Sequence, residues 1–323
     1  MKQGYKKMFW VVLMLVVTGV LFLVLQRQYG NPQKEKNGCF TGAFLTDNPG
    51  KADILSFQKA YGKKPYFVLM FTDWNSFPDS GSIKEILEES SCPIITWEPW
   101  EDYSVPVDPA KILTGGYDEY IREFALKIGS FEGEVMIRFA HEMNGDWYPW
   151  AGSVIGAENY KKMYRYVKDI FDDAGVRNVK WIFSVNWEDV PKTAGNDMMN
   201  YYPGDEYADY IGIDGYNWGT AREWSKWRSF RDIFSKTYKK LVEELGKPVI
   251  ISEFSSVSEG GNKAQWIRQA MRDIRSWNEI KGFVLFNVDK EADWMFPADK
   301  KCGMEFGREI GDPYFKDKGG DDR

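Results

Sequence analysis

Eight short apolar segments recur along this 323-residue chain, separated by stretches with the spacing of amphipathic helices. The segments are rich in Val, Ile or aromatic residues, and most are continuously apolar, as strands buried on both faces of a parallel sheet are. They are residues 39–45, 66–74, 93–100, 134–142, 179–187, 210–216, 248–254 and 281–288. This alternation predicts βα units in the α/β class, and eight parallel strands are the number that closes a TIM barrel, (β/α)8.

Helices are predicted between these strands, and glycine follows the first two of the three clearest ones. These three are residues 157–174, 224–245 and 263–277. The chain has room for two small domains, but single barrels of about 250 residues are common. We therefore expect one barrel domain over residues 39–312 and a polar tail over residues 313–323, which is disordered after Lys316.

The N-terminal residues 1–25 contain an uncharged run of 18 residues from Met8 to Leu25, with lysines before it. A run of this length can span a bilayer, and it is long for the core of a cleaved signal peptide. It predicts a signal-anchor with the lysines in the cytoplasm and the rest of the chain outside the membrane. Cleavage after Leu25 is the alternative and would make the protein secreted. Residues 26–38 are polar and turn-rich, as expected of a linker.

Composition excludes several classes of function. The net charge of −6 offers no basic excess for neutralising phosphates, so nucleic acid is not an expected partner. The chain has one histidine and three isolated cysteines, Cys39, Cys92 and Cys302. Neither a metal site nor a cofactor is therefore predicted. A single disulfide between two of the cysteines is left as an alternative. No GxSxG elbow is present. We expect a monomer. The chain has 14 tryptophans, and those that reach the surface would suit stacking on flat molecules.

Two glutamates end predicted strands. Glu142 ends the fourth strand and Glu253 the seventh, and each follows a largely uncharged segment. Catalytic groups of such barrels lie where strands end, so the two carboxyls should converge on one rim. Glycoside hydrolysis needs such a pair, with retention at a separation of about 5–5.5 Å and inversion at about 6.5–9.5 Å. A buried strand end with satisfied polar groups is the alternative for Glu142.

Residues 39 to about 300 resemble glycoside hydrolase family 26, retaining (β/α)8 enzymes with the motif R-x-x-H-E-M-N-G-x-W on the fourth strand and a glutamate on the seventh. The residues matching the motif are Arg138, His141, Glu142, Met143, Asn144, Gly145 and Trp147. The resemblance implies that Glu142 is the general acid/base and Glu253 the nucleophile. It also implies that Tyr216 lies beside the nucleophile and that His141 contacts the sugar, although a core histidine is the alternative.

Roles for neighbouring residues follow from this assignment. Before attack Glu253 must be ionised, so Tyr216 and Arg138 are candidates for its support. Arg138 also needs an anion, and Asp214 is the candidate, with a purely structural ion pair as the alternative. Sugar binding is expected of a set of polar and aromatic residues, with core packing as the alternative for most of the tryptophans. The set is His141, Asn144, Trp147, Tyr216, Trp97, Trp218 and Trp294, with Trp100 and Trp150 as further subsites.

Departures from the mannan-cleaving members bear on the substrate. Their third-strand loop usually has a tryptophan-histidine pair, whereas Glu98 follows Trp97 here. Phe139 stands where they have proline, and Tyr148 to Trp150 where they have two tryptophans. We expect an endo-β-glycanase of the lichenase type, acting on mixed-linkage β-1,3/1,4-glucan, with β-mannan second and a cell-surface exopolysaccharide third. A membrane-tethered polysaccharide-binding protein without turnover and a metal-dependent hydrolase are the alternative classes.

Overall fold

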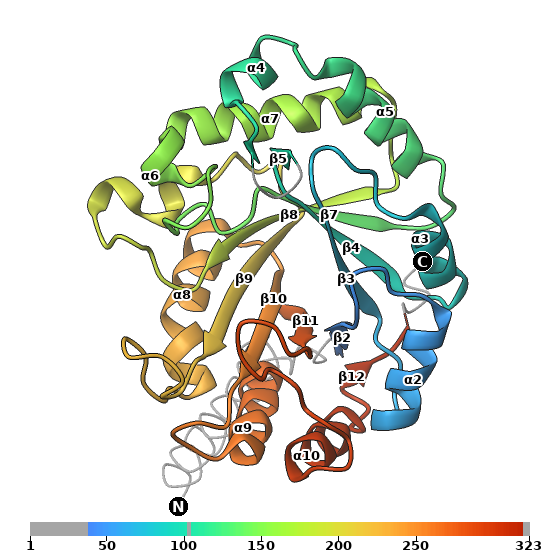
Figure 1. Ribbon diagram of the computed structural model, residues 1–323, viewed down its shortest axis with the longest axis vertical. Coiled ribbons are helices and arrows are strands. Elements are labelled where there is room, and N and C mark those ends of the chain that lie inside the picture. Colours follow the sequence, from blue (N-terminus) through green and yellow to red (C-terminus); the bar gives the residue numbers. More distant parts are fainter. Residues whose placement is uncertain (1–37, 102–104, 319–323) are drawn as a thin grey trace, which may run out of the picture. The chain divides into compact units, whose positions relative to one another are not determined.

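A closed barrel of eight parallel strands forms the centre of the computed structural model, which describes residues 38–101 and 105–318 (Figure 1). Each strand pairs with the next, and the last pairs back with the first, which confirms the predicted (β/α)8 fold. In order around the barrel they are β2 (Gly42–Phe44), β3 (Phe67–Thr72), β4 (Cys92–Trp97), β7 (Val135–Phe139), β8 (Val179–Asn186), β9 (Tyr210–Asn217), β10 (Val249–Ser256) and β11 (Ile280–Phe286).

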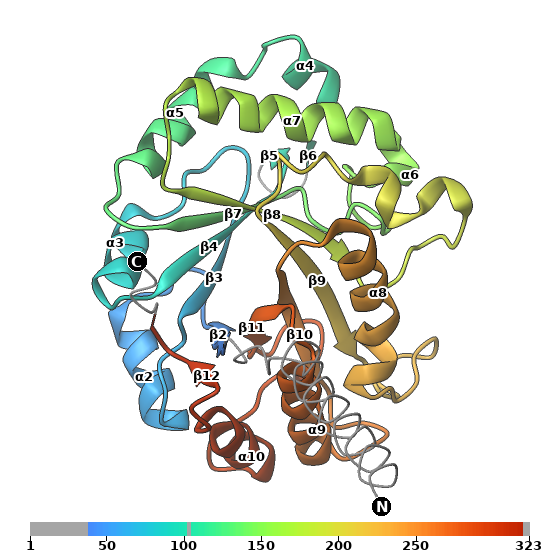
Figure 2. The same cartoon turned by 180° about the vertical axis from the view of Figure 1, so that it is seen from behind.

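Helices surround the strands on the outside of the barrel, as Figures 1 and 2 show from opposite sides. The longer ones are α2 (Lys51–Tyr61), α3 (Ser80–Glu88), α5 (Asp118–Gly129), α7 (Ala157–Asp173), α8 (Phe230–Leu245), α9 (Lys263–Ser276) and α10 (Lys301–Ile310). Short elements lie in the loops: α4 (Pro109–Leu113), α6 (Gly152–Ile155), η1 (Ala194–Asn196), η2 (Met198–Tyr201) and the hairpin β5 (Trp100–Glu101) with β6 (Val105–Pro106).

The strands are apolar on both faces because both faces are buried, one inside the barrel and the other under the helices. Successive side chains point to opposite sides of a strand. In β3, Phe67 and Leu69 belong to a cluster that fills the barrel, whereas Val68 and Met70 belong to the larger core under the helices. This double burial explains why the strand segments read as continuous apolar runs.

Most predicted strands begin or end one to three residues away from the observed ones, and three other differences change an element. The helix expected from residue 224 begins at Phe230, because Ser229 and Asp232 form a capping box at its start. The first strand is split by Thr41 into β1 (Cys39–Phe40) and β2. Within the expected tail, β12 (Phe315–Lys316) pairs with β1, so the domain extends past residue 312 to at least Lys316.

The predicted membrane segment at residues 8–25, most of the linker and the last five residues lie outside the described residues. Among the helices of residues 38–101 and 105–318, none is long and apolar enough to cross a membrane. The three cysteines all lie in described segments, and each is a free thiol.

Candidate functional site

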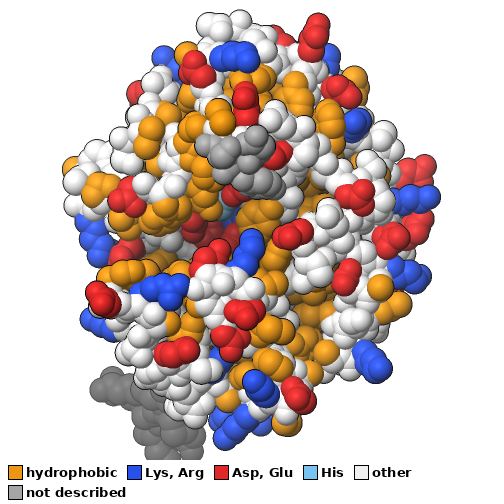
Figure 3. Space-filling view, in the orientation of Figure 1, with side chains coloured by type: hydrophobic (Ala, Val, Ile, Leu, Met, Phe, Trp, Pro, Cys, Tyr) orange, Lys and Arg blue, Asp and Glu red, His pale blue; other side chains and the backbone are white. Residues whose placement is uncertain are grey.

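A cavity of about 1090 Å³ opens where the barrel strands end. Figure 3 shows a hollow in this face with acidic and hydrophobic side chains around it. Glu142, Glu253 and most of the predicted sugar-binding residues line it. The cavity is lined by Asp47, Phe71, Glu98, His141, Glu142, Trp147, Tyr148, Asn186, Trp187, Glu188, Val190, Tyr216, Trp218, Trp224, Ser225, Lys226, Arg228, Glu253, Phe286, Lys290, Glu291 and Trp294.

Glu142 lies in the loop that follows β7 rather than at the end of the strand. The strand ends at Phe139, and Ala140 and Glu142 have φ values of 47° and 54°, which are uncommon for residues other than glycine. Such strain is often found where a side chain is held for function. Trp147 Nε1 donates to Glu142 Oε2 at 2.9 Å. Burial, reinforced by the charges of Asp214 and Glu253, raises the pKa of Glu142 well above its ordinary value.

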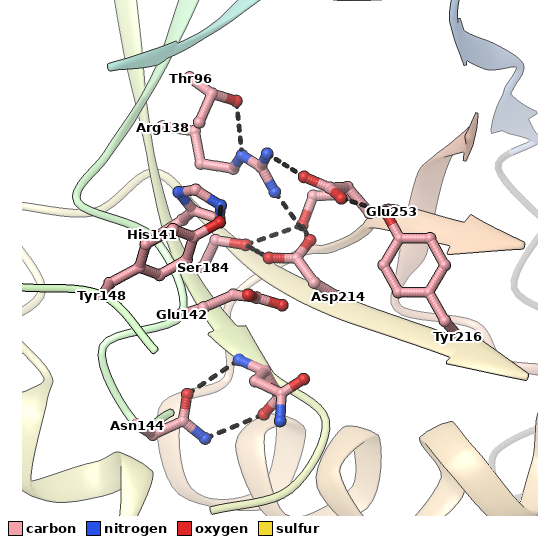
Figure 4. Close-up of polar contacts among 12 residues, drawn as sticks. Thr96, Arg138, His141, Glu142, Asn144, Tyr148, Ser184, Asp214, Tyr216 and Glu253 are labelled. Carbon is pink, nitrogen blue, oxygen red and sulfur yellow. Dashed lines mark hydrogen bonds and ion pairs between the residues drawn. The ribbon is translucent and has the colours of Figure 1, made fainter. Parts of the chain in front are cut away.

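Glu253 faces the cavity because β10 is irregular at this point. Its pairing with β9 shifts register between Ile250 and Glu253. Such a bulge re-aims side chains next to active sites. Arg138 Nη2 donates to one oxygen of Glu253 and the Tyr216 hydroxyl donates to the other (Figure 4). The contacts predicted for Arg138 and Tyr216 are therefore present, and both stabilise a negative charge on this carboxylate.

Arg138 and Asp214 form the floor of the site, where both are fully buried. Arg138 Nη1 donates to Asp214 Oδ1 at 2.8 Å and Arg138 Nε to Thr96 Oγ1 at 2.8 Å. Ser184 and Ser252 donate to Asp214 at 2.9 and 2.7 Å. Burial raises the pKa of Asp214, and the charge of Arg138 opposes that rise. Each of the three guanidinium nitrogens of Arg138 thus donates to a different residue, and these contacts hold the side chain in position against Glu253.

His141 reaches the cavity together with Tyr148, whose hydroxyl lies 3.2 Å from His141 Nε2. Burial, with the charge of Arg138 second, lowers the pKa of His141 well below its ordinary value, so the ring is neutral. The ring of Tyr148 stacks on Trp150 at 4.4 Å, and Trp100 packs edge-on against Trp150 at 5.2 Å. Neither Trp100 nor Trp150 lines the cavity. Trp150 is buried in the core, whereas Trp100 is partly exposed and also packs on Tyr148 at 5.8 Å.

Trp97 and Asn144, which were predicted to bind sugar, lie away from the cavity. Trp97 is fully buried outside the barrel, where it stacks between Trp74 at 4.7 Å and Phe124 at 4.0 Å. Asn144 is also fully buried and does not line the cavity. Its side-chain oxygen accepts from Asn186 N at 2.8 Å, and its amide donates to Asn186 O at 2.9 Å, as Figure 4 shows. Asn144 therefore ties the loop after β7 to the end of β8.

Trp147, Tyr216, Trp218 and Trp294 line the cavity as predicted. Trp147 is partly exposed and packs over Gly145, where a Cβ would lie 2.5 Å from its ring. Tyr216 and Trp294 pack at 4.8 Å. Aromatic residues of the motif, of the sixth strand and of the loops after the sixth and eighth strands are thus brought together around the two glutamates.

Sequence reasoning missed Glu98, which lines the cavity with 6% of its surface exposed. Burial raises its pKa to about 7, against a weak hydrogen bond from Trp100. The signal was available, since Glu98 is a carboxylate at the end of a predicted strand, like Glu142. Trp224 was missed because its segment was expected to be helical.

The charges around the cavity are mostly negative. Six lining residues carry carboxyl groups, and three are cationic, namely Lys226, Arg228 and Lys290. This balance suits an uncharged ligand better than an anionic one. Within the described residues, no cluster of three His, Cys, Asp or Glu side chains is placed to hold a metal ion.

Comparison with known proteins gives matches over most of the barrel. The family described as Glycosyl hydrolase family 26 matches residues 114–286. Endoglucanase H from Acetivibrio thermocellus is 37% identical over 307 residues, which cover 92% of this chain and 33% of that protein. A mannan endo-1,4-beta-mannosidase from Bifidobacterium adolescentis is 28% identical over 163 residues, which cover 50% of this chain and 16% of that protein. This chain thus spans a third or less of either relative's length.

Among solved structures, the catalytic domain of an endo-beta-1,4-mannanase from Bacillus sp. JAMB-750 is similar to this chain. It aligns over 90% of this chain and 89% of its own, with a TM-score of 0.67 and 19% identity. At that identity the similarity concerns the fold, and it agrees with the closed barrel described above.

Proposed function

This chain belongs to glycosyl hydrolase family 26, and from that membership we propose that it hydrolyses β-glycosidic bonds within a polysaccharide by double displacement, with retention of configuration. One observation carries the proposal: two carboxyls face one cavity in opposite environments. Glu142 is buried with one neutral donor, which favours the protonated form. Glu253 accepts from a guanidinium and a phenol, and both donors stabilise negative charge on the attacking oxygen.

In the first step, a Glu253 carboxylate oxygen attacks the anomeric carbon while the bond from that carbon to the leaving oxygen breaks. Glu142 gives its proton to the leaving oxygen, so the shortened chain departs as a neutral alcohol. Trp147 holds the Glu142 carboxyl in place during this transfer. The product of the step is a glycosyl ester on Glu253, with Glu142 now ionised.

In the second step, water attacks the anomeric carbon and the ester bond to Glu253 breaks. Glu142 takes a proton from the water, because esterification has removed the charge of Glu253 that contributed to its raised pKa. Arg138 and Tyr216 receive the carboxylate that is released. The site returns to its starting protonation with the configuration of the sugar retained.

For the substrate, we propose mixed-linkage β-1,3/1,4-glucan ahead of β-mannan. A relative named as an endoglucanase aligns over 92% of this chain, whereas the one named as a mannosidase aligns over 50%. Both polymers are uncharged, as the acidic cavity favours. Glu98 lies where the mannan-cleaving members have a histidine, so the contacts to the sugar should differ there.

The test replaces each glutamate by glutamine and measures the reducing ends released from lichenan and from β-mannan. Glu142→Gln should lower kcat by roughly 10²- to 10⁴-fold and Glu253→Gln by at least as much. Glu134→Gln, just before the other end of β7, is the matched control and should keep full activity. Undiminished hydrolysis in either cavity variant would refute the assignment. A wild type that binds these polymers without cleaving them would be a polysaccharide-binding protein.

We also propose that the protein acts as a monomer outside the cytoplasm, anchored to the membrane by residues 8–25. The uncharged run from Met8 to Leu25 has 18 residues, which is long enough to span a bilayer. The full chain should stay with membranes through an alkaline wash, whereas a chain starting at Gly38 should be released. Recovery of a shortened form from the medium would indicate cleavage near Leu25 instead.

A further inference from the structure

Aromatic rings run without interruption from the proposed nucleophile to the rim of the cavity. Tyr216 donates to Glu253 and packs against Trp294, with ring centroids 4.8 Å apart. Trp294 meets Trp218 edge-on at 4.7 Å, and Trp218 meets Trp224 at 5.5 Å. All four rings line the cavity. They therefore form an aromatic strip, Tyr216–Trp294–Trp218–Trp224, that leads outward from the reacting carboxyl.

The outer end of the strip is exposed to solvent. Trp294 is 1% exposed, whereas Trp224 is 72% exposed. Packing in a core therefore explains Trp294 but not Trp224. Exposing so much apolar surface costs free energy, and exposed apolar surface on the rim of a binding cavity marks an interaction site.

The loop that carries Trp224 is braced on both sides. Ser225 Oγ donates to Gly219 O at 2.9 Å, and the Arg222 guanidinium lies 5.2 Å from the Trp218 ring. Gly219 has a φ of 49°, and a Cβ at this position would lie 1.8 Å from Glu259 O. These contacts hold the loop against Trp218 and against the segment after β10. The loop that carries Trp224 is thus braced before any ligand binds, which lowers the entropy that binding must overcome.

Polar groups accompany the exposed ring. Ser225 and Lys226 follow Trp224 and also line the cavity. An aromatic face with hydroxyl and ammonium groups beside it matches a sugar ring, which has an apolar face of C–H groups and a polar edge of hydroxyls. The strip is continuous with the proposed catalytic centre, so a chain threaded past Glu253 would extend over it.

We propose that Trp224, backed by Trp218, forms an outer subsite that binds one neutral hexose of the polysaccharide, beyond the sugars flanking the scissile bond. This inference rests on the proposed glycanase function. The outer subsite adds binding energy for long chains that short substrates do not receive.

The test compares Trp224→Ala with wild type on mixed-linkage oligosaccharides of increasing length and on an aryl glycoside with a single sugar. Loss of one aromatic contact should lower kcat/KM by roughly 2- to 10-fold on the long substrates and leave the aryl glycoside unchanged. Trp224→Tyr should keep most of the activity. Val154→Ala, another exposed apolar side chain away from the cavity, is the control.

Equal losses of kcat/KM on long and short substrates would indicate collapse of the loop and would overturn the outer subsite. An unchanged kcat/KM on every substrate would overturn it as well. A binding measurement separates this inference from the proposed function. Binding to mixed-linkage glucan slows the migration of a protein through a native gel that contains the polysaccharide. In the Glu253→Gln background, adding Trp224→Ala should weaken this retardation. If wild type cleaves nothing, the glycanase proposal fails, and this retardation alone decides for or against the outer subsite.

Discussion

Glu98 is a third carboxyl in the cavity, and its ionisation should be visible in the stability of the protein. Burial raises its pKa from 4.5 to about 7, with Glu253 adding to the rise and Arg138 and Lys290 opposing it. The folded state therefore holds this proton more tightly than the unfolded chain does. Its contribution to stability is fully present below about pH 4.5 and is lost as pH rises to about 7.

Glu98→Gln should remove this pH dependence. A rise of this size corresponds to at most about 3 kcal/mol across the window. The free energy of unfolding of Glu98→Gln minus that of wild type should therefore be larger at pH 8 than at pH 5, as measured by urea denaturation. The exposed Glu243→Gln is the control and should show equal differences at both pH values. Equal differences for Glu98→Gln would contradict a carboxyl that is desolvated by the fold.

Tyr216→Phe should impair the chemical step more than folding. The hydroxyl donates to Glu253, and a hydrogen bond to a charged group contributes about 1.5–3 kcal/mol. We expect kcat to fall by roughly 10- to 100-fold while the melting temperature falls by only a few degrees, because the ring remains packed on Trp294. The control is Tyr202→Phe, whose hydroxyl donates to Asp205 at the surface. A loss seen only in KM would place Tyr216 in substrate binding instead.

The sequence predicted those residues of the site whose place follows from their position at the end of a strand. It missed those for which the strand register decides whether the side chain faces the cavity. Glu142 lies just after β7 and Glu253 lies near the end of β10, so their convergence on one rim could be predicted without coordinates. Trp97 and Glu98 are adjacent, and a shift of one residue exchanges which of them faces the cavity. Thr96 faces inward to Arg138, which turns Trp97 outward and Glu98 inward.

At the scale of elements, the loop before α8 illustrates why helix boundaries are hard to predict. Residues 224–229 have helix-compatible composition, but the helix begins only at Phe230. Ser229 Oγ accepts from Asp232 N at 3.1 Å, and Asp232 Oδ2 accepts from Ser229 N at 3.1 Å. This capping box satisfies two backbone donors and leaves Trp224 in a loop at the cavity rim.

Ser229→Ala should therefore destabilise the start of α8 by about 1 kcal/mol, because a backbone donor loses its partner. Chemical denaturation would measure the change, with the exposed Ser258→Ala as a control outside any helix. Ser229→Asp should retain most of the stability, since aspartate is also a good N-cap. If Ser229→Ala and Ser258→Ala unfold alike, the capping box does not set the boundary of the helix.

At the scale of the whole molecule, the number of strands was predictable because double burial gives each strand a continuous apolar run. The pairing of β12 with β1 was not predictable, because β12 has two residues within a polar segment. Cys39 N donates to Tyr314 O at 2.9 Å, and Thr41 N donates to Lys316 O at 2.9 Å. Long-range pairing of the two ends of the domain leaves no periodic signal in so short a stretch.

Phe315 anchors this terminal strand to the barrel. It is 2% exposed and lies 5.8 Å from Phe283 of β11, at the end of the barrel opposite the cavity. Phe315→Ala should lower stability by about 3–5 kcal/mol through the cavity that it creates. For a domain of this size, the melting temperature should fall by roughly 6–15 °C. The control is the exposed Lys318→Ala, which should melt like wild type.

Activity separates stability from function in this variant. The proposed catalytic groups are held by Arg138, Tyr216 and Trp147, none of which contacts β12. Well below its melting temperature, Phe315→Ala should therefore hydrolyse the substrate at the wild-type rate, and the rate should collapse only as the protein unfolds. A loss of kcat in the folded variant would mean that the pairing of β12 with β1 also sets the geometry of the site. An unchanged melting temperature would mean that residues 313–318 add little to the domain.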